Sequence, residues 1–260
     1  MAEGNNLLRD VRQKLARLED SIMFALFERA QYCFNSKIYT PGAIKIPSFV
    51  VHAGKKDFFT LDYPFTLSVQ YFHGSFLDYL LQGTEFLHST AGRYAHPEEH
   101  PFFKDLPSPQ IPREKYSQLI ESVRKNKLNF NDELLQIYLE AIPRICKPGD
   151  DNEYGSAAIA DIACLQALSR RIHLGACVAE AKFQEAPEEF GRLIRRKNKK
   201  RITRELRDEK TEQDILERVR QKGKRYGVDP QVIAEFYEKK IIPLTIKDEV
   251  AYLMGRVQNG

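Results

Sequence analysis

Apolar residues near the start of the chain recur at steps of three and four positions. The series is Leu8, Val11, Leu15, Leu18, Ile22 and Leu26, with charged residues between its members. Such spacing gathers the apolar side chains on one face of an α-helix. We therefore expect an amphipathic helix at the start of the chain, and Arg12 lies on it.

The helical pattern is lost between Asn35 and His73, where three prolines and two glycines interrupt the sequence. A connection of this length without regular structure is uncommon inside a compact domain. We interpret this stretch as a loop or an insertion, in which residues 58–67 can form a short strand.

Helical periodicity returns after residue 73 and continues, with interruptions, to the end of the chain. Ser75 is a suitable N-cap for the first of these helices, and Ser156 is a suitable N-cap for the longest. The prolines between Pro97 and Pro112 and the segment 147–155 predict loops. The expected helices cover residues 75–87, 129–142, 156–184, 188–196 and 202–226, followed by a last pair that begins at Asp229-Pro230 and divides near Pro243.

The expected helix over residues 156–184 has apolar side chains around most of its circumference, which predicts a buried, central helix. The sequence shows no fixed-period repeat and no convincing set of strands. We therefore expect an all-α fold, with residues 1–260 forming a single-domain multi-helix bundle around one long central helix.

The composition supports a folded protein without a membrane span. Hydrophobic residues make up 42% of the chain and aromatic residues 11%, which is enough for a substantial core. No apolar run approaches the roughly 18 residues that cross a bilayer. The start of the chain carries no signal or transit pattern, and the four cysteines have no metal-ligand spacing. We expect a cytoplasmic protein without a metal site, or a plastid form if a leader precedes this chain.

Charge gives little guidance at the level of the whole chain. The 40 basic and 36 acidic residues leave a formal net charge of +4, so any preference for an anionic ligand must come from local placement. The segment Arg192–Arg207 holds nine basic residues, which can form a nucleic-acid surface. We favour a solvated helical surface, because no aromatic residue lies among these charges.

Two cations on the central helix suggest a binding site. Arg171 and Lys182 are eleven residues apart, which corresponds to three helical turns plus about 20° and a separation of about 16 Å along one face. Gly175 and Val178 lie between them on that face and are small. Both cations can simply be exposed to solvent, but a charge on a buried helix needs a partner. The pair therefore suits a small molecule with two separated anionic groups.

Two further pairs have the spacing of side-chain neighbours on a helix, Asp208 with Glu212 and Thr245 with Glu249. Each pair alone is compatible with an ordinary solvated face. The chain has no nucleophile motif and no phosphate-binding glycine loop. Pattern and spacing alone therefore predict a helical protein with a candidate anion-binding pocket, and they predict no specific function.

Several segments together resemble the large eukaryotic chorismate mutases. These segments are Val11–Ile22, His100–Phe103, Gly149–Ser156, Cys164–His173, Val178–Gln184 and Ile242–Thr245, and their order and spacing hold over nearly the whole chain. The resemblance implies an isomerase that converts chorismate to prephenate by a pericyclic rearrangement, in phenylalanine and tyrosine biosynthesis. It also implies a homodimer and no cofactor.

The resemblance assigns roles to the residues found by spacing. Arg12 and Arg171 match the arginines that hold the two substrate carboxylates. Lys182 matches the lysine that reaches the ether oxygen, and Glu249 matches a glutamate that must be protonated to donate to the same oxygen. Three more positions match substrate-binding residues: Asp208 near the substrate hydroxyl, Glu212 beside it, and Thr245 in the pocket.

The resemblance also implies regulation by tryptophan, tyrosine or phenylalanine at the dimer interface. The matching positions in this chain are Gly92, Arg93, Asn152, Gly155 and Ser156, and Gly92 stands where one interface arginine is usual. Compared with the family, residues 51–72 are an insertion, either a lid or a loop. Asp248 replaces an apolar residue, a change that can loosen the last helix.

Two alternatives to an active mutase stay open from the sequence. The first is a relative that keeps the fold but has weak or no activity, because the insertion or the altered last helix spoils the pocket. The second is a helical nucleic-acid-binding module that uses Arg192–Arg207. Retention of all seven pocket positions favours the active enzyme.

Overall fold

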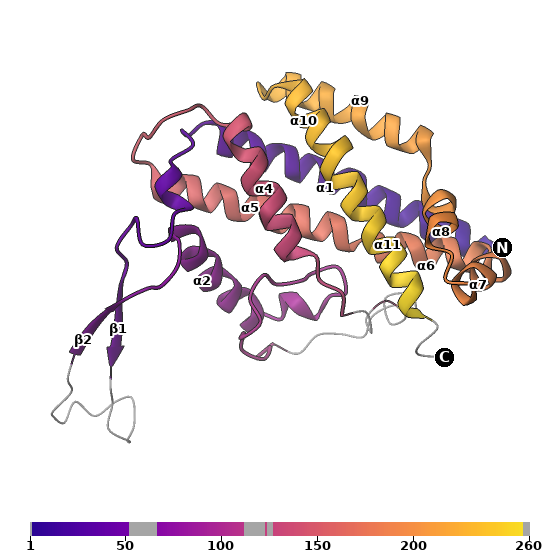
Figure 1. Ribbon diagram of the computed structural model, residues 1–260, viewed down its shortest axis with the longest axis horizontal. Coiled ribbons are helices and arrows are strands. Elements are labelled where there is room, and N and C mark those ends of the chain that lie inside the picture. Colours follow the sequence, from indigo (N-terminus) through magenta and orange to yellow (C-terminus); the bar gives the residue numbers. More distant parts are fainter. Residues whose placement is uncertain (1, 52–66, 112–122, 124–126, 257–260) are drawn as a thin grey trace.

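Three helices form the centre of the molecule. The computed structural model describes residues 2–51, 67–111, 123 and 127–256. Helix α1 (Ala2–Ala30) packs along α5 (Tyr154–His173) and α6 (Gly175–Glu185), which follow one another almost in line (Figure 1). The apolar stripe of α1 faces this contact, and Ile22 and Leu26 are fully buried. The predicted all-α bundle is confirmed, because helices form its body.

The central helical segment differs from its prediction at both its start and its middle. It begins at Tyr154, so Ser156 lies in the first turn and is not the N-cap. It is also interrupted at Leu174. This residue is both the C-cap of α5 and the N-cap of α6. Twelve of the twenty residues of α5 are buried, as expected for a central helix.

The next elements cover one side of this centre. Helix α2 (Phe76–Thr90) begins with the predicted cap: the Ser75 hydroxyl accepts the Asp78 N–H at 3.1 Å, and the Asp78 carboxylate accepts the Ser75 N–H at 2.9 Å. Each bond satisfies a donor that the start of a helix leaves free. The short 3-10 helix η2 (Arg93–Ala95) follows, and α4 (Asn131–Ile145) packs on α5.

The segment predicted as one helix over residues 202–226 is two helices. After α7 (Pro187–Arg195), helix α8 (Lys199–Leu206) is separated from α9 (Glu209–Tyr226) by two residues. Asp208 causes the restart, because it is extended and its side chain accepts the Thr211 N–H at 3.0 Å. It is therefore an N-cap, whereas the spacing alone placed it on a helix face with Glu212.

The last two helices are joined without a loop. A π-helical turn, η3 (Tyr237–Ile241), connects α10 (Pro230–Phe236) to α11 (Ile242–Arg256). Pro243 explains the wider turn, because a proline has no N–H to donate and its ring crowds the carbonyl four residues earlier. The predicted division near Pro243 therefore takes the form of a local change in helical pitch.

A hairpin occupies part of the stretch expected as an irregular loop. After the short 3-10 helix η1 (Ser36–Ile38), strands β1 (Pro47–Val51) and β2 (Leu67–Tyr71) pair antiparallel and project from the helical body (Figure 1). The strand suggested for residues 58–67 lies, except for Leu67, outside the described residues. The interpretation of 51–72 as an insertion or lid stays a prediction.

A buried polar cluster joins α1 to α5. The Arg29 guanidinium donates to Asp161 at 2.7 Å, and both side chains are fully buried. Tyr39 and Tyr138 donate to the same carboxylate, and Arg29 also binds the Phe34 carbonyl. These hydrogen bonds replace the water contacts that the charged groups of Arg29 and Asp161 lose on burial.

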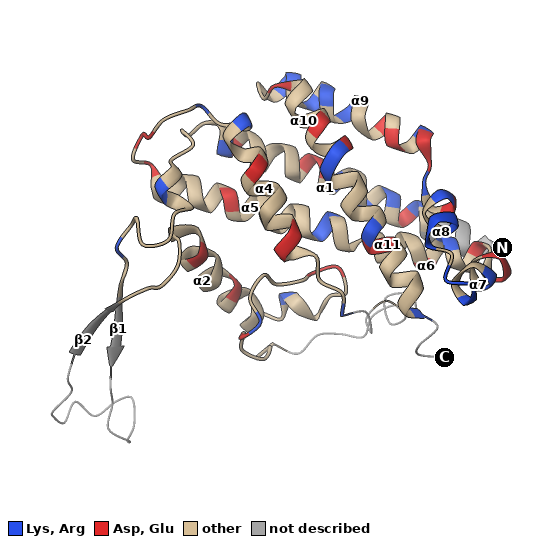
Figure 2. Cartoon of the chain, viewed as in Figure 1, with Lys and Arg blue, Asp and Glu red and all other residues tan. Residues whose placement is uncertain are grey.

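Basic residues gather along the end of α7 and along α8, within the segment Arg192–Arg207 (Figure 2). Part of this charge is neutralised locally by ion pairs of Arg201 with Glu205 and of Arg207 with Glu212. No helix in the described part of the chain is long and apolar enough to cross a membrane.

Candidate active site

One cavity contains every residue that the sequence assigned to catalysis or substrate binding. It measures about 90 Å³ and lies where α1, α5, α6, α9 and α11 meet. The seven predicted residues in its wall are Arg12, Arg171, Lys182, Asp208, Glu212, Thr245 and Glu249. Apolar side chains complete it, namely Leu15, Val178, Leu206, Ile215, Ile242 and Ile246. A polar wall with an apolar remainder suits a small ring-containing ligand that carries charges.

Arg171 is the most enclosed cation of the cavity. It lies in the last turn of α5 and only 3% of its surface is exposed. Its Nη1 donates to the Thr245 hydroxyl at 2.8 Å, and that hydroxyl donates to the Ile241 carbonyl at 2.8 Å. Its guanidinium also lies 5.6 Å from the centre of the Tyr237 ring. The buried Nε has no hydrogen-bond partner among the described residues.

Lys182 and Glu249 face the cavity from α6 and α11. The Lys182 ammonium donates to the Leu206 carbonyl. Glu249 is buried, and its Oε2 has no hydrogen-bond partner within the part of the chain that the structure describes. Burial raises the pKa of Glu249 to about 7, although Lys182 and Arg171 act in the opposite direction. This carboxyl group is therefore substantially protonated near neutral pH.

Two ion pairs lie at the more exposed side of the cavity. Arg12 Nη2 lies 3.1 Å from the Asp208 carboxylate, and both side chains are largely exposed. Hydrogen bonds from the Thr211 N–H and hydroxyl hold the pKa of Asp208 below its usual value. Arg207 binds Glu212 with two hydrogen bonds, of 3.0 and 2.8 Å. The sequence analysis did not identify Arg207, because this pairing depends on the break between α8 and α9.

The charges of the cavity do not balance. Arg12 and Glu212 are paired as described, and the pKa of Glu249, about 7, leaves much of this carboxyl group uncharged near neutral pH. No described carboxylate forms an ion pair with Arg171 or Lys182. Arg171 is buried and Lys182 is half-buried. Because a cation removed from water needs a counter-charge, the cavity favours a ligand that brings negative charge to both. The predicted recess between these cations is only half correct, since Val178 lines the cavity whereas Gly175 packs against α11.

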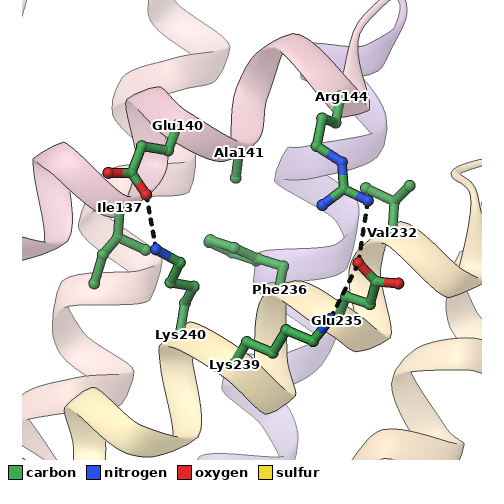
Figure 3. A pocket seen from close by; sticks show the side chains of 9 residues that line it. All are labelled: Ile137, Glu140, Ala141, Arg144, Val232, Glu235, Phe236, Lys239 and Lys240. Carbon is green, nitrogen blue, oxygen red and sulfur yellow. Dashed lines mark hydrogen bonds and ion pairs between the residues drawn. The ribbon is translucent and has the colours of Figure 1, made fainter.

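A larger cavity of about 190 Å³ lies between α4 and the end of α10 (Figure 3). Its charged side chains bind one another: Glu140 pairs with Lys240 at 2.7 Å, and Arg144 pairs with Glu235 at 3.1 Å. It holds none of the predicted residues and, in contrast to the first cavity, its lining charges are compensated. No described group of His, Cys, Asp or Glu side chains is arranged to hold a metal ion.

The predicted effector residues lie at two separate places, one beside the middle of α5 and one at its start. Gly92 is the N-cap of η2, and Arg93 is its first residue. Arg93 donates to Glu99 and, on α5, to Gln166, each at 2.9 Å. Asn152 precedes α5, and Gly155 and Ser156 belong to its first turn. Eleven residues separate Gly155 from Gln166, which corresponds to about 16 Å along a helix. One small effector cannot contact both places within one chain.

The geometry agrees with similarity to known proteins. A family model described as chorismate mutase type II matches residues 154–250. Chorismate mutase 1, chloroplastic, of Zea mays is 37% identical, over 96% of this chain and 78% of the relative. The chorismate mutase of Schizosaccharomyces pombe is also 37% identical, over 96% of each protein. A 33% identical relative from Zea mays is named cytosolic.

Solved structures of the same class share the fold. The chorismate mutase of Candida albicans, in complex with L-Trp, superimposes with a TM-score of 0.83 at 35% identity, covering 99% of this chain and 95% of that one. A chorismate mutase with tyrosine bound in its allosteric site gives a TM-score of 0.80 at 36% identity, covering 96% of both chains. The fold, the seven residues around one cavity and the sequence identity along nearly the whole chain agree: this chain belongs to the chorismate mutase family.

Proposed function

We propose that this chain is an active chorismate mutase, which isomerises chorismate to prephenate in phenylalanine and tyrosine biosynthesis. The observation that carries the proposal is the unbalanced charge of the cavity. Arg171 and Lys182 have no carboxylate partner among the described residues, and Glu249 beside them can be protonated near neutral pH. Chorismate carries two carboxylates and an ether oxygen. Arg171 suits one carboxylate, Arg12 in the same cavity suits the other, and Lys182 and Glu249 suit the ether oxygen.

The reaction requires positioning more than chemical participation by the protein. It is a pericyclic rearrangement, in which one carbon–oxygen bond breaks as one carbon–carbon bond forms within the same molecule. The enzyme must hold the enolpyruvyl side chain over the ring. We assign this task to Arg171 and Arg12, because arginine binds a carboxylate with two hydrogen bonds in a fixed orientation. Arg12 exchanges its exposed Asp208 partner for the substrate.

Negative charge develops on the ether oxygen as its bond to the ring breaks. We assign Lys182 and protonated Glu249 to this oxygen as hydrogen-bond donors. Donors held in place before the reaction are effective because they need no rearrangement as charge develops. Burial favours the neutral form of Glu249, and that form has the proton to donate.

The remaining polar groups define the rest of the pocket. Asp208 and Glu212, at the start of α9, are placed to accept from the substrate hydroxyl. Thr245 holds the Arg171 guanidinium through its own hydroxyl.

The test of the proposal is chorismate consumption by the purified protein and by Lys182→Ala. We expect rapid conversion to prephenate by the wild type and a loss of about 10²–10³-fold in kcat in the variant, the usual effect of removing one transition-state donor. Lys199→Ala, on the exposed face of α8, is the matched control and keeps wild-type activity. No turnover by folded wild-type protein would contradict the proposal and indicate an inactive relative.

We also propose that the protein is a homodimer with aromatic amino acids as effectors. The side chains of Phe24 and Ile159, in α1 and α5, are 54% and 64% exposed and border a hollow of about 580 Å³. Phe86 and Leu87 in α2 are similarly exposed. An apolar surface of this kind is typical of an interface.

A dimer also solves the separation of the effector residues, because Arg93 of one chain can meet Ser156 of another. Two solved relatives contain tryptophan or tyrosine, the latter in an allosteric site. Titration with tryptophan, tyrosine and phenylalanine should change kcat or KM in the wild type and have a weaker effect in Arg93→Ala. An identical response of the two proteins would contradict the assignment.

The cellular compartment is a separate proposal. Relatives include chloroplastic and cytosolic forms, and we propose the cytosol for this protein. Imaging of the tagged full-length protein in its host tests this proposal, and a plastid signal would contradict it.

A further inference from the structure

Asp248 is a buried acid with no described cation beside it. It precedes Glu249 on α11 and has no solvent exposure. Its Oδ2 accepts the Ala176 N–H at 2.9 Å, while its buried Oδ1 has no hydrogen-bond partner among the described residues. Burial, and then the neighbouring Glu249, raise the pKa of Asp248 well above its usual value. Burial thus disfavours the charged form of this carboxyl group.

The bond to Ala176 lies at the break between α5 and α6. The first N–H groups of a helix have no acceptor within that helix. At the start of α6, the N–H groups of Cys177 and Val178 bind the Leu174 carbonyl at 3.0 and 3.1 Å. Ala176 is 1% exposed and directs its N–H to Asp248. Asp248 thus satisfies a buried donor that the break creates.

Helix α11 approaches this break very closely. A Cβ atom on Gly175 would lie 2.9 Å from Asp248 Oδ2, 3.0 Å from the Thr245 carbonyl oxygen and 3.2 Å from Glu249 Cγ. Such contacts are too short for a side chain larger than hydrogen. The break therefore rests directly against the turn of α11 that carries both Thr245 and Glu249.

Three elements of the site meet at this point. Helix α5 ends there after Arg171, α6 begins there and carries Lys182, and α11 crosses there with Glu249. We propose that Asp248 is a positioning residue for the rearrangement: by binding the Ala176 N–H it fixes α6 relative to α5 and α11, and with them the spacing of Lys182, Arg171 and Glu249. This inference rests on the proposed function.

The charged groups around Asp248 are consistent with a positioning role. Glu249 lies beside Asp248 on the same helix, and the Cys177 thiol lies nearby on α6. Lys182, Arg171 and Glu212 act on the neighbouring Glu249. No described cation forms an ion pair with Asp248. Its contribution is the hydrogen bond, which an apolar residue at this position cannot make.

The first test compares Asp248→Val with Asp248→Asn. Valine removes the acceptor, and we expect kcat to fall about tenfold, less than the ~100-fold that a 1 Å misplacement can cost, with little change in KM. Asparagine has nearly the same shape and keeps an acceptor oxygen, so kcat should stay within about twofold and the pH profile should keep its midpoint. Lys247→Gln, an exposed neighbour on α11, is the control and should match the wild type.

A second measurement does not depend on activity. Amide hydrogen exchange of the segment 172–180 should accelerate in Asp248→Val and not in Asp248→Asn, because only valine leaves the Ala176 N–H without an acceptor. If Asp248→Val does not fold, Gly175→Ala disturbs the same contact from the other side and should lower kcat in the same way.

Wild-type kcat and wild-type exchange in Asp248→Val would overturn the inference. A lower pH midpoint in Asp248→Asn would overturn it as well, because it would show an ionised Asp248 acting through its charge. An inactive wild type whose exchange still depends on Asp248 would contradict the proposed function alone and leave the structural contact established.

Discussion

Single residues in the cavity differ mainly in what holds them. Arg171 is fixed by Thr245, by the Tyr237 ring and by burial, whereas Arg12 is exposed and exchanges partners easily. Arg171 is therefore oriented before the substrate binds, and Thr245 contributes through it.

Replacing Thr245 tests this orientation. Thr245→Val removes the hydroxyl at nearly constant volume and leaves one Arg171 donor without its acceptor. A hydrogen bond to a charged group contributes about 1.5–3 kcal/mol, so kcat/KM should fall by about tenfold or more. Thr245→Ser restores the hydroxyl and should recover most of the loss. Steady-state kinetics of both variants test this role. Equal kcat/KM values for Thr245→Val and Thr245→Ser would contradict the orientation of Arg171 by the Thr245 hydroxyl.

The sequence predicted which residues share the cavity better than it predicted their local structure. The step from Arg171 to Lys182 follows from helical geometry, which a break of one residue hardly alters. The capping role of Asp208 was missed because charge spacing alone does not show where a helix restarts. The partners Arg207 and Leu206 were missed because both become visible only once α8 ends.

At the scale of elements, the predicted and observed helices differ most where a helix is interrupted, because tertiary contacts decide the position of each interruption. The interruption at Leu174 lies under α11, and the π turn before Pro243 adjusts the register of that helix. Periodicity correctly predicted which segments are helical, because a helix forms where apolar residues recur at the helical period and can be buried on one face. It could not predict the exact ends, because these depend on contacts between distant segments, such as Asp248 with Ala176.

The Arg29–Asp161 cluster should be a main determinant of stability. It joins α1 to α5 through fully buried side chains. Removing one partner leaves the other charge buried, which typically costs about 3–5 kcal/mol. Arg29→Met should therefore lower the free energy of unfolding by that amount in urea titration, while the kcat of the folded fraction stays close to wild type. A loss below about 1 kcal/mol, the value of an exposed pair, would contradict this role.

For the whole molecule, the exposed apolar surface on α1, α2 and α5 sets the expected assembly. Apart from the family resemblance, no pattern in the sequence indicated this surface, because exposure depends on how the helices pack. The β1–β2 hairpin was also beyond prediction, since its segment has neither a helical nor a clear strand period.

The proposed dimer can be tested on that surface. Ile159→Asp places a charge on a side chain that is 64% exposed in the single chain, so the monomer should fold normally. If this surface is the interface, the variant should elute as a monomer in light-scattering chromatography, where the wild type elutes as a dimer. Ser36→Asp, at an exposed position outside the surface, is the control. A dimeric Ile159→Asp would place the interface elsewhere.

Catalysis as proposed depends on a protonated Glu249 in the same cavity as Lys182. The pKa of Glu249 is about 7, and the active form is the protonated one. Activity should thus be highest below that value and be lost as the pH rises through it.

The most direct measurement is kcat for chorismate as a function of pH, for the wild type and for Glu249→Gln. Glutamine keeps an N–H donor and cannot ionise. We predict that wild-type kcat declines with a midpoint near pH 7, as set by the pKa of Glu249, and that the variant shows no decline over the same range. A flat wild-type profile, or the same decline in both proteins, would contradict the account.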